Sequence, residues 1–259
     1  MMVYLMEDTI SQRILDYWMD QEGVRMMIGE IDLDNDLIME NMMGPNAVRI
    51  LEEMTRDMDL RKGMRILDLG CGKGLTSIYL ARKFGVTVYA TDLWIGATEN
   101  FNRFKELGLD DLIIPIHAEA HELPYAEGFF DIIISVDSFH YFGHEEGYLE
   151  EHLAPLLKKG GRILVGVPGL RKEFDEGVPE EMRPFYQFDY NFHTCEWWKA
   201  HWETSDLVED IRCREIKCHE QAWEDWLSCD NEHAIQDRPM MEAEGGKYYN
   251  TVSLHAIRK

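Results

Sequence analysis

The segment that most constrains the fold is Arg65-Ile-Leu-Asp-Leu-Gly-Cys-Gly-Lys-Gly74, where an apolar run leads directly into three glycines at alternate positions. Residues 75–84 follow with the composition of a helix. Glycine reaches backbone angles and close approaches that a residue with a Cβ does not. A strand, a glycine-rich turn and a helix in this order indicate a turn at which a ligand approaches bare backbone.

The spacing of the glycines distinguishes two kinds of ligand site. The dinucleotide fingerprint is G-x-G-x-x-G, in which the helix N-terminus holds a pyrophosphate. This chain has D-x-G-x-G-x-G instead. The pattern resembles the first motif of class I S-adenosylmethionine (SAM) methyltransferases, and the alternative is a glycine-rich turn in another doubly wound fold. The resemblance implies that the cofactor SAM contacts Asp68, Gly70, Cys71, Gly72 and Gly74.

Strand-like apolar runs alternate with amphipathic stretches along much of the chain. We predict strands at 65–69, 87–91, 112–117, 130–136 and 162–168, and helices at 75–84, 98–107 and 148–157. This alternation favours right-handed crossovers and a parallel sheet covered on both faces. Weaker candidates at 211–218 and 250–257 would close the sheet. The predicted class is α/β, a Rossmann-like seven-stranded, mostly parallel sheet with its last strand antiparallel.

We divide the chain into four predicted segments, one of which is the alternating core. They are a helical N-terminal lid on the acceptor side (1–61), a SAM-binding core (62–168), a cap insertion (169–210) and the closing strands with an intervening segment (211–259). Within the first segment, Met43-Gly-Pro-Asn-Ala47 interrupts the chain before a predicted helix at 47–58. Asn46 is the expected cap of that helix.

The composition limits the kinds of partner that the protein is expected to bind. The net charge of −23 argues against nucleic acid and against an anionic membrane surface, because both require a basic footprint. The first residues, Met-Met-Val-Tyr-Leu-Met-Glu-Asp, lack the basic start and apolar core typical of a signal peptide, and no apolar run is long enough to cross a membrane. Five scattered cysteines match no zinc signature and predict reduced thiols. We expect a cytoplasmic protein without a metal, either a monomer or a homodimer.

Ligands of an open α/β sheet lie at the carboxyl ends of the strands, so the residues after each strand matter most. Asp92 follows the second strand and lies 20 residues beyond Gly72, the spacing of an acid that binds ribose hydroxyls. The alternative is an aspartate that caps the next helix. Leu93 and Trp94 would then flank the adenine, although Trp94 also suits packing against that helix.

Three further segments resemble the methyltransferase family. His117-Ala-Glu-Ala-His-Glu-Leu-Pro-Tyr125 resembles G-D-A-x-x-L-P-F, which implies that Glu119, beside Ala120, reaches the adenine amino group. The strand from residue 130 resembles F-D-x-V-x-S, and implies that Ser135 and Val136 offer backbone to SAM. Residues 157–161 resemble L-K-P-G-G. Together these segments look like a poorly characterised bacterial group of small-molecule methyltransferases.

The residues after the fourth strand are the candidates for catalysis. Asp137, His140 and Tyr141 would face the transferred methyl group. His140 suits a general base because imidazole titrates near neutrality, and the alternative is a histidine bonded to backbone. Adjacent residues of a helical turn diverge, so we expect one of His140 and Tyr141 to face the methyl. Asp137 could hold a cationic acceptor or the SAM ammonium.

Candidates for acceptor binding lie outside the core. They are Tyr17 and Trp18 near the N-terminus, and His193 and Trp197 in the predicted cap. The function predicted is SAM-dependent methyl transfer to a nitrogen or oxygen of a small molecule. The alternatives are a lipid-modifying enzyme of the cyclopropane-synthase type and a SAM-binding regulator without catalysis.

Overall fold

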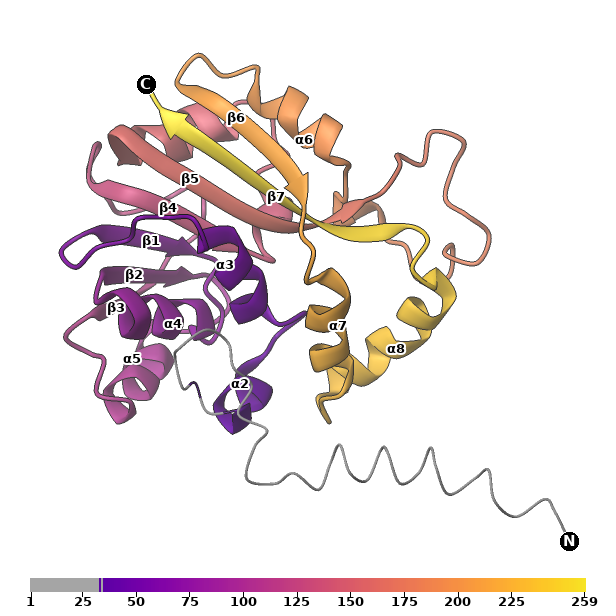
Figure 1. Cartoon of the computed structure of the whole chain (residues 1–259), viewed down its shortest axis with the longest axis horizontal. Helices are drawn as coiled ribbons and strands as arrows, with labels where there is room; N and C mark the ends of the chain where they lie inside the picture. The colour runs from indigo at the N-terminus through magenta and orange to yellow at the C-terminus, as the bar shows by residue number, and fades with distance from the viewer. Residues whose placement is uncertain (1–32, 34) are drawn as a thin grey trace, which may run out of the picture.

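The structure, a computed structural model, describes residues 33 and 35–259 (Figure 1). Seven strands form one sheet in the order β3-β2-β1-β4-β5-β7-β6. Their bounds are β1 Arg65–Leu69, β2 Thr87–Asp92, β3 Ile113–His117, β4 Phe130–Val136, β5 Leu157–Leu170, β6 Val208–Glu215 and β7 Tyr249–Arg258. β7 runs antiparallel to β5 and β6, and the other pairs are parallel. The predicted fold class is confirmed.

Helices cover both faces of the sheet. Their bounds are α2 Asn35–Asn41, α3 Ala47–Thr55, α4 Leu75–Phe84, α5 Ala97–Glu106, α6 Cys195–Trp202, α7 His219–Leu227 and α8 Glu232–Glu244. Alternate residues of β4 enter different cores, since Ile132 and Ile134 join one cluster and Ile133 joins the other. This alternation is the period-2 pleat of a strand buried on both faces.

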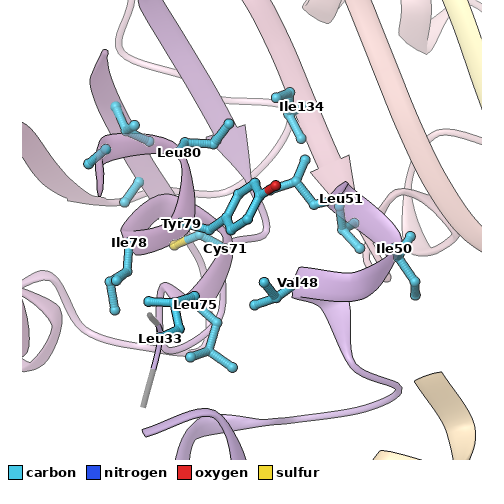
Figure 2. Packing of buried hydrophobic residues seen from close by; sticks show 14 of the residues in the cluster. Leu33, Val48, Ile50, Leu51, Cys71, Leu75, Ile78, Tyr79, Leu80 and Ile134 are labelled. Carbon is cyan, nitrogen blue, oxygen red and sulfur yellow. The ribbon is translucent and has the colours of Figure 1, made fainter. Parts of the chain in front are cut away.

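The first cluster joins the N-terminal helices to the glycine turn. Val48 and Leu51 of α3 pack with Leu75 and Tyr79 of α4, and Leu33 lies beside them (Figure 2). α3 begins where the sequence predicted, because the Asn46 side chain accepts hydrogen bonds from the backbone N–H of Val48 (3.1 Å) and Arg49 (3.2 Å). This packing brings residues 41–47 to the carboxyl ends of the parallel strands.

Two predicted local structures differ from those observed. Residues 148–157 form a π turn, η2 Leu149–Leu153, and a 3₁₀ turn, η3 Ala154–Leu156, because Pro155 has no N–H to continue an α-helix. The predicted L-K-P-G-G-like turn lies inside β5, where the register against β4 shifts between Phe130 and Ile132. β5 therefore begins five residues earlier than predicted.

The C-terminal third also differs from prediction. α6 lies in the region predicted as a cap, yet it packs against β6 and β7 with Trp198 and Trp202 fully buried. α7 and α8, which were not predicted, lie between β6 and β7 beyond the carboxyl ends of the parallel strands (Figure 1). The Asn46 backbone N–H donates to the Ala222 carbonyl of α7 at 2.9 Å, which ties this helix pair to the N-terminal region.

Candidate cofactor and acceptor site

The glycine turn holds three positive φ angles in succession. Gly70, Gly72 and Gly74 have φ of 71°, 54° and 81°, which is the left-handed region that favours glycine. A Cβ on Gly70 would collide with the Ser138 side chain beyond β4, and one on Gly74 would lie 2.5 Å from the Phe104 ring of α5. Because these glycines have no Cβ, the residues after β4 and helix α5 can pack directly against the turn.

A cavity of about 200 Å³ lies against this turn, at the point where the strand order reverses between β1 and β4. Ligands of open α/β sheets bind at such switch points. The walls are Asn41–Pro45, Ala47, Leu69–Lys73, Leu75, Thr76, Thr91–Trp94, Ala118–Ala120, Val136–Ser138, Tyr141 and Phe142. Residues 41–45, Thr76, Thr91 and Ser138 were not individually predicted, because nothing in their local sequence marks them as ligand contacts.

Asp92 accepts three backbone hydrogen bonds. Its Oδ2 accepts from Gly72 N–H at 2.8 Å, and its Oδ1 accepts from Trp94 N–H (2.7 Å) and Ile95 N–H (2.8 Å). A carboxylate has about four acceptor positions, so Oδ2 keeps one for a ligand hydroxyl. Asp92 thus caps the turn after β2, not helix α5, and faces the cavity as the ribose prediction requires.

Asp68 lies behind the cavity wall and not in it. Its Oδ2 accepts from the hydroxyls of Thr76 and Ser77, both at 2.6 Å, while Oδ1 is buried without a partner among the described residues. Burial raises the Asp68 pKa to about 6, opposed by these two hydrogen bonds and reinforced by nearby Asp92. The unpaired Oδ1 could bind a positively charged or hydrogen-bond-donating group of a ligand that reaches past the glycine turn.

The neighbouring thiol is not reactive. Cys71 lines the cavity but is buried, and burial followed by the charges of Asp68 and Asp92 raises its pKa well above the ordinary value. The thiol therefore stays protonated and contributes a packing surface.

Glu119 lines the cavity and is held from outside by a histidine. Its carboxylate accepts from His121 N–H at 2.8 Å, and its Oε1 lies 2.8 Å from His121 Nδ1. His121 Nε2 in turn lies 3.1 Å from Glu145. The hydrogen bond that the His121 ring donates to Glu119 is the largest factor that raises the His121 pKa above its ordinary value. His121 thus links the loop after β3 to the loop after β4.

Asp137 occupies the strained position at the end of β4. Its φ is 58°, its backbone N–H donates to Gly166 O at 2.7 Å, and its side chain lines the cavity beside Gly44. Within the described chain its carboxylate forms no hydrogen bond or ion pair. Burial, with a smaller contribution from the charge of Asp237, raises its pKa to about 7.

Of the next two predicted catalytic residues, only Tyr141 lines the cavity, and His140 is buried outside it. Tyr141, in η1 Phe139–Tyr141, lines the cavity and is 49% exposed, whereas His140 is 3% exposed and absent from the wall. Burial lowers the His140 pKa to about 3, so its imidazole is neutral. Its Nδ1 has no hydrogen-bond partner in the described region. His140 is therefore not hydrogen-bonded to the backbone through Nδ1. Of the two residues, Tyr141 is the one that lines the cavity.

Some of the remaining predicted residues line the cavity and others do not. Val136, Ala120, Leu93 and Trp94 line the cavity, whereas Ser135 is buried, with its hydroxyl 2.9 Å from that of Ser138. His193 stacks on Trp197 at 3.7 Å and contacts Glu173, and neither ring reaches the cavity wall. Tyr17 and Trp18 lie outside the described residues.

The mouth of the cavity is apolar. Met43, Leu93, Trp94 and Tyr141 are 44%, 50%, 68% and 49% exposed, although large apolar side chains are usually covered. The rings of Trp94 and Tyr141 lie 5.4 Å apart across this mouth. The cavity thus has a polar floor, formed by the glycine turn and Asp92, and an apolar rim.

Comparisons with known proteins agree with this geometry. Residues 67–165 match the family model described as a methyltransferase domain. The chain is 31% identical over 129 residues to methyltransferase GfsG of Streptomyces halstedii, covering 49% of this chain and 46% of that protein. It is 35% identical over 114 residues to sarcosine/dimethylglycine N-methyltransferase of Halorhodospira halochloris, covering 44% and 40%. The chain thus spans less than half the length of these relatives.

Solved structures share the fold over a longer stretch. Geranyl diphosphate C-methyltransferase from Streptomyces coelicolor A3(2) superposes with a TM-score of 0.65 at 19% identity, covering 81% of this chain and 77% of that one. Phosphoethanolamine N-methyltransferase 2 of Haemonchus contortus gives 0.66 at 18%, covering 91% and 60%. Residues 67–165 therefore match a methyltransferase domain, and the chain shares its fold with these solved methyltransferases.

Proposed function

We propose that this protein is an enzyme that transfers a methyl group from SAM to a nitrogen or oxygen of a small molecule. The observation that carries the proposal is the cavity at the switch point, where the glycine turn is tied to Asp92 through Gly72 N–H at 2.8 Å. The relatives support it, since they are named as methyltransferases of small molecules, including sarcosine and dimethylglycine.

The residues of the site fit SAM. Asp92 has an acceptor position for ribose hydroxyls, Leu93 and Trp94 offer apolar surface to an adenine, and Glu119 reaches the same end of the cavity. Near the turn, the buried and unpaired Oδ1 of Asp68 would accept from the cofactor's ammonium, directly or through a water molecule. Bound SAM supplies an electrophilic methyl whose bond to sulfur breaks as the acceptor atom bonds it, leaving the electron pair on sulfur.

The chain's own contribution to this reaction is placement and removal of a proton. Asp137 and Tyr141 line the same cavity as Asp92, and we assign them to the acceptor. Methyl transfer requires the acceptor and methyl to be held in line at roughly 3–3.5 Å. Asp137, with its pKa raised to about 7, is suited to take a proton near neutral pH. His140 is proposed to support Tyr141 from behind, with ring centroids 4.0 Å apart.

The location and partners belong to the same proposal. The net charge of −23 supports a cytoplasmic protein that does not bind nucleic acid, as a monomer or homodimer. Among the described residues, no helix is both apolar enough and long enough to span a membrane.

The test combines binding with turnover. The full chain is titrated with SAM by calorimetry and then incubated with methyl-labelled SAM and small-molecule extract, and labelled products are identified by mass. Labelled product together with S-adenosylhomocysteine is expected. SAM binding without any labelled product across broad extracts would favour the SAM-binding regulator instead, and absence of SAM binding would contradict both.

A further inference from the structure

A continuous series of rings leads away from the mouth of the cavity. The centroids of Trp94 and Tyr141 lie 5.4 Å apart, those of Tyr141 and His140 4.0 Å, those of His140 and Phe192 5.6 Å, and those of Phe192 and Tyr190 4.9 Å. We call these five rings the aromatic wall. It joins the cofactor end of the site to residues 190–192, which precede α6 and lie in the segment predicted as a cap.

One carboxylate, Asp137, lines the cavity beside Tyr141, and a second, Asp237, adds negative charge from another part of the chain. Asp137 follows β4, and Asp237 lies in α8, a hundred residues later. Asp237 accepts from Trp226 Nε1 at 2.9 Å. The negative charge of Asp237 contributes, less than burial does, to raising the pKa values of Asp137, Tyr141 and Tyr190. Neither carboxylate forms an ion pair within the described chain.

The wall also contains an unused hydrogen-bonding atom. His140 Nδ1 is buried and has no partner within the described chain, although its ring contacts both Tyr141 and Phe192. Buried polar atoms in folded proteins are nearly always paired, and an exception requires an explanation. His140 therefore places an unpaired polar atom next to the ring of Tyr141, which lines the cavity.

We infer that the acceptor is an organic amine, bound in its protonated form by Asp137 against the rings of Trp94 and Tyr141, which line the same cavity. The inference rests on the proposed function and deepens it. Ring faces attract ammonium groups, and carboxylates supply charge that phenolate or carboxylate acceptors would meet as repulsion. The apolar mouth formed by Met43, Leu93, Trp94 and Tyr141 indicates that the amine carries apolar substituents.

The chemistry of this acceptor balances within the site. The protonated amine transfers its proton to the Asp137 carboxylate, which frees the nitrogen lone pair. That pair forms the bond to the methyl carbon as the carbon–sulfur bond breaks, so the product is an ammonium with one more methyl and S-adenosylhomocysteine. Asp137 then releases its proton to solvent. The pKa of about 7 at Asp137 agrees with this transfer.

The experiment compares choline with 3,3-dimethylbutan-1-ol, a neutral molecule of the same shape. Binding of S-adenosylhomocysteine to the full chain is measured first, and each probe is then titrated at millimolar concentrations into the loaded protein. We expect choline to bind at least about tenfold more tightly, since the cation alone differs. Asp137→Asn should reduce this preference to about twofold or less, while S-adenosylhomocysteine affinity and the melting temperature change little.

Matched control variants distinguish an effect at the proposed site from a general effect of net charge. Asp230→Asn removes the same charge from an exposed position between α7 and α8 and should leave the preference intact. Tyr141→Phe should retain the preference and Tyr141→Leu should weaken it, because the ring face is the feature required.

Equal affinity for the two probes would overturn the inference, and so would equal effects of Asp137→Asn and Asp230→Asn. Failure to bind S-adenosylhomocysteine would instead contradict the proposed function. The two probes would then be compared on the unloaded chain, where the same preference decides whether the amine site exists.

Discussion

At the scale of single residues, the site depends on groups that serve the fold and the ligand together. Asp92 holds the glycine turn through Gly72 and shapes the bend after β2 through Trp94 and Ile95. Sequence spacing indicated the ligand role of Asp92, but not this structural one. The three backbone bonds fix the carboxylate before any ligand arrives, which reduces the entropy lost on binding.

Asp92→Ala is expected to weaken SAM binding at least about tenfold, or about 1.4 kcal/mol, because a ligand acceptor and the bond to Gly72 are lost together. Calorimetry on the folded variant measures this. Asp111→Ala, at an exposed position, serves as the control and should bind SAM as the natural chain does. Unchanged affinity in Asp92→Ala would refute the ribose assignment.

Gly70→Ala should destabilise the fold more than Gly128→Ala. Both glycines have positive φ, 71° and 63°, so both variants pay a similar backbone strain of about 1 kcal/mol. A Cβ at Gly70 also meets the Ser138 side chain, whereas nothing lies within 4 Å of one at Gly128. Thermal unfolding of both variants gives the comparison. Equal losses would show that the close approach to β4 is unimportant.

At the scale of elements, helix α3 links the glycine turn to the helix pair α7–α8. Asn46 caps α3 with its side-chain oxygen and donates its Nδ2 to Asp225 of α7 at 2.7 Å. The cap was predicted from sequence, because capping depends on residues next to each other. The bond to Asp225 joins residues 179 positions apart, so only the folded chain shows it.

Asn46→Ala is expected to cost about 2 kcal/mol of unfolding free energy, because the cap and the buried bond to Asp225 are both lost. Asn231→Ala provides the comparison, since Asn231 caps α8 through His233 N–H alone and should cost about 1 kcal/mol. Denaturant titration measures both. A smaller cost at Asn46 than at Asn231 would contradict the proposed link between α3 and α7.

At the scale of the whole molecule, acid pH acts on buried groups in opposite directions. The His140 pKa is lowered to about 3, so its stabilising contribution is lost as pH falls below the ordinary value of 6.5. The Asp68 and Asp137 pKa values are raised to about 6 and about 7, so their contributions are fully present below 3.8 and are lost as pH rises through these values. The effects partly cancel in the natural chain.

His140→Gln should separate the two effects. The variant cannot take up a proton on unfolding, so the melting temperature of the natural chain relative to the variant should fall as pH decreases from about 7 to about 5. Paired melting curves at several pH values measure the difference. A constant difference across this range would show that His140 is not held neutral by burial.

The sequence by itself determined the strand, glycine turn and helix around Asp68, the acid at Asp92, and the alternation that specifies a mostly parallel sheet. These features depend on periodicity and spacing within short stretches, where local geometry decides the outcome. Boundaries near Pro155 and within β5 were missed because proline and a shift in strand pairing overrode the local pattern.

Only the tertiary structure decided how the acceptor side is built. It placed Tyr141 and not His140 in the cavity wall, and it buried Trp198 and Trp202 of α6 against β6 and β7. These outcomes depend on how helices α6 to α8 pack against strands far away in the sequence. Their physical cause is long-range burial of apolar surface, which no local pattern encodes.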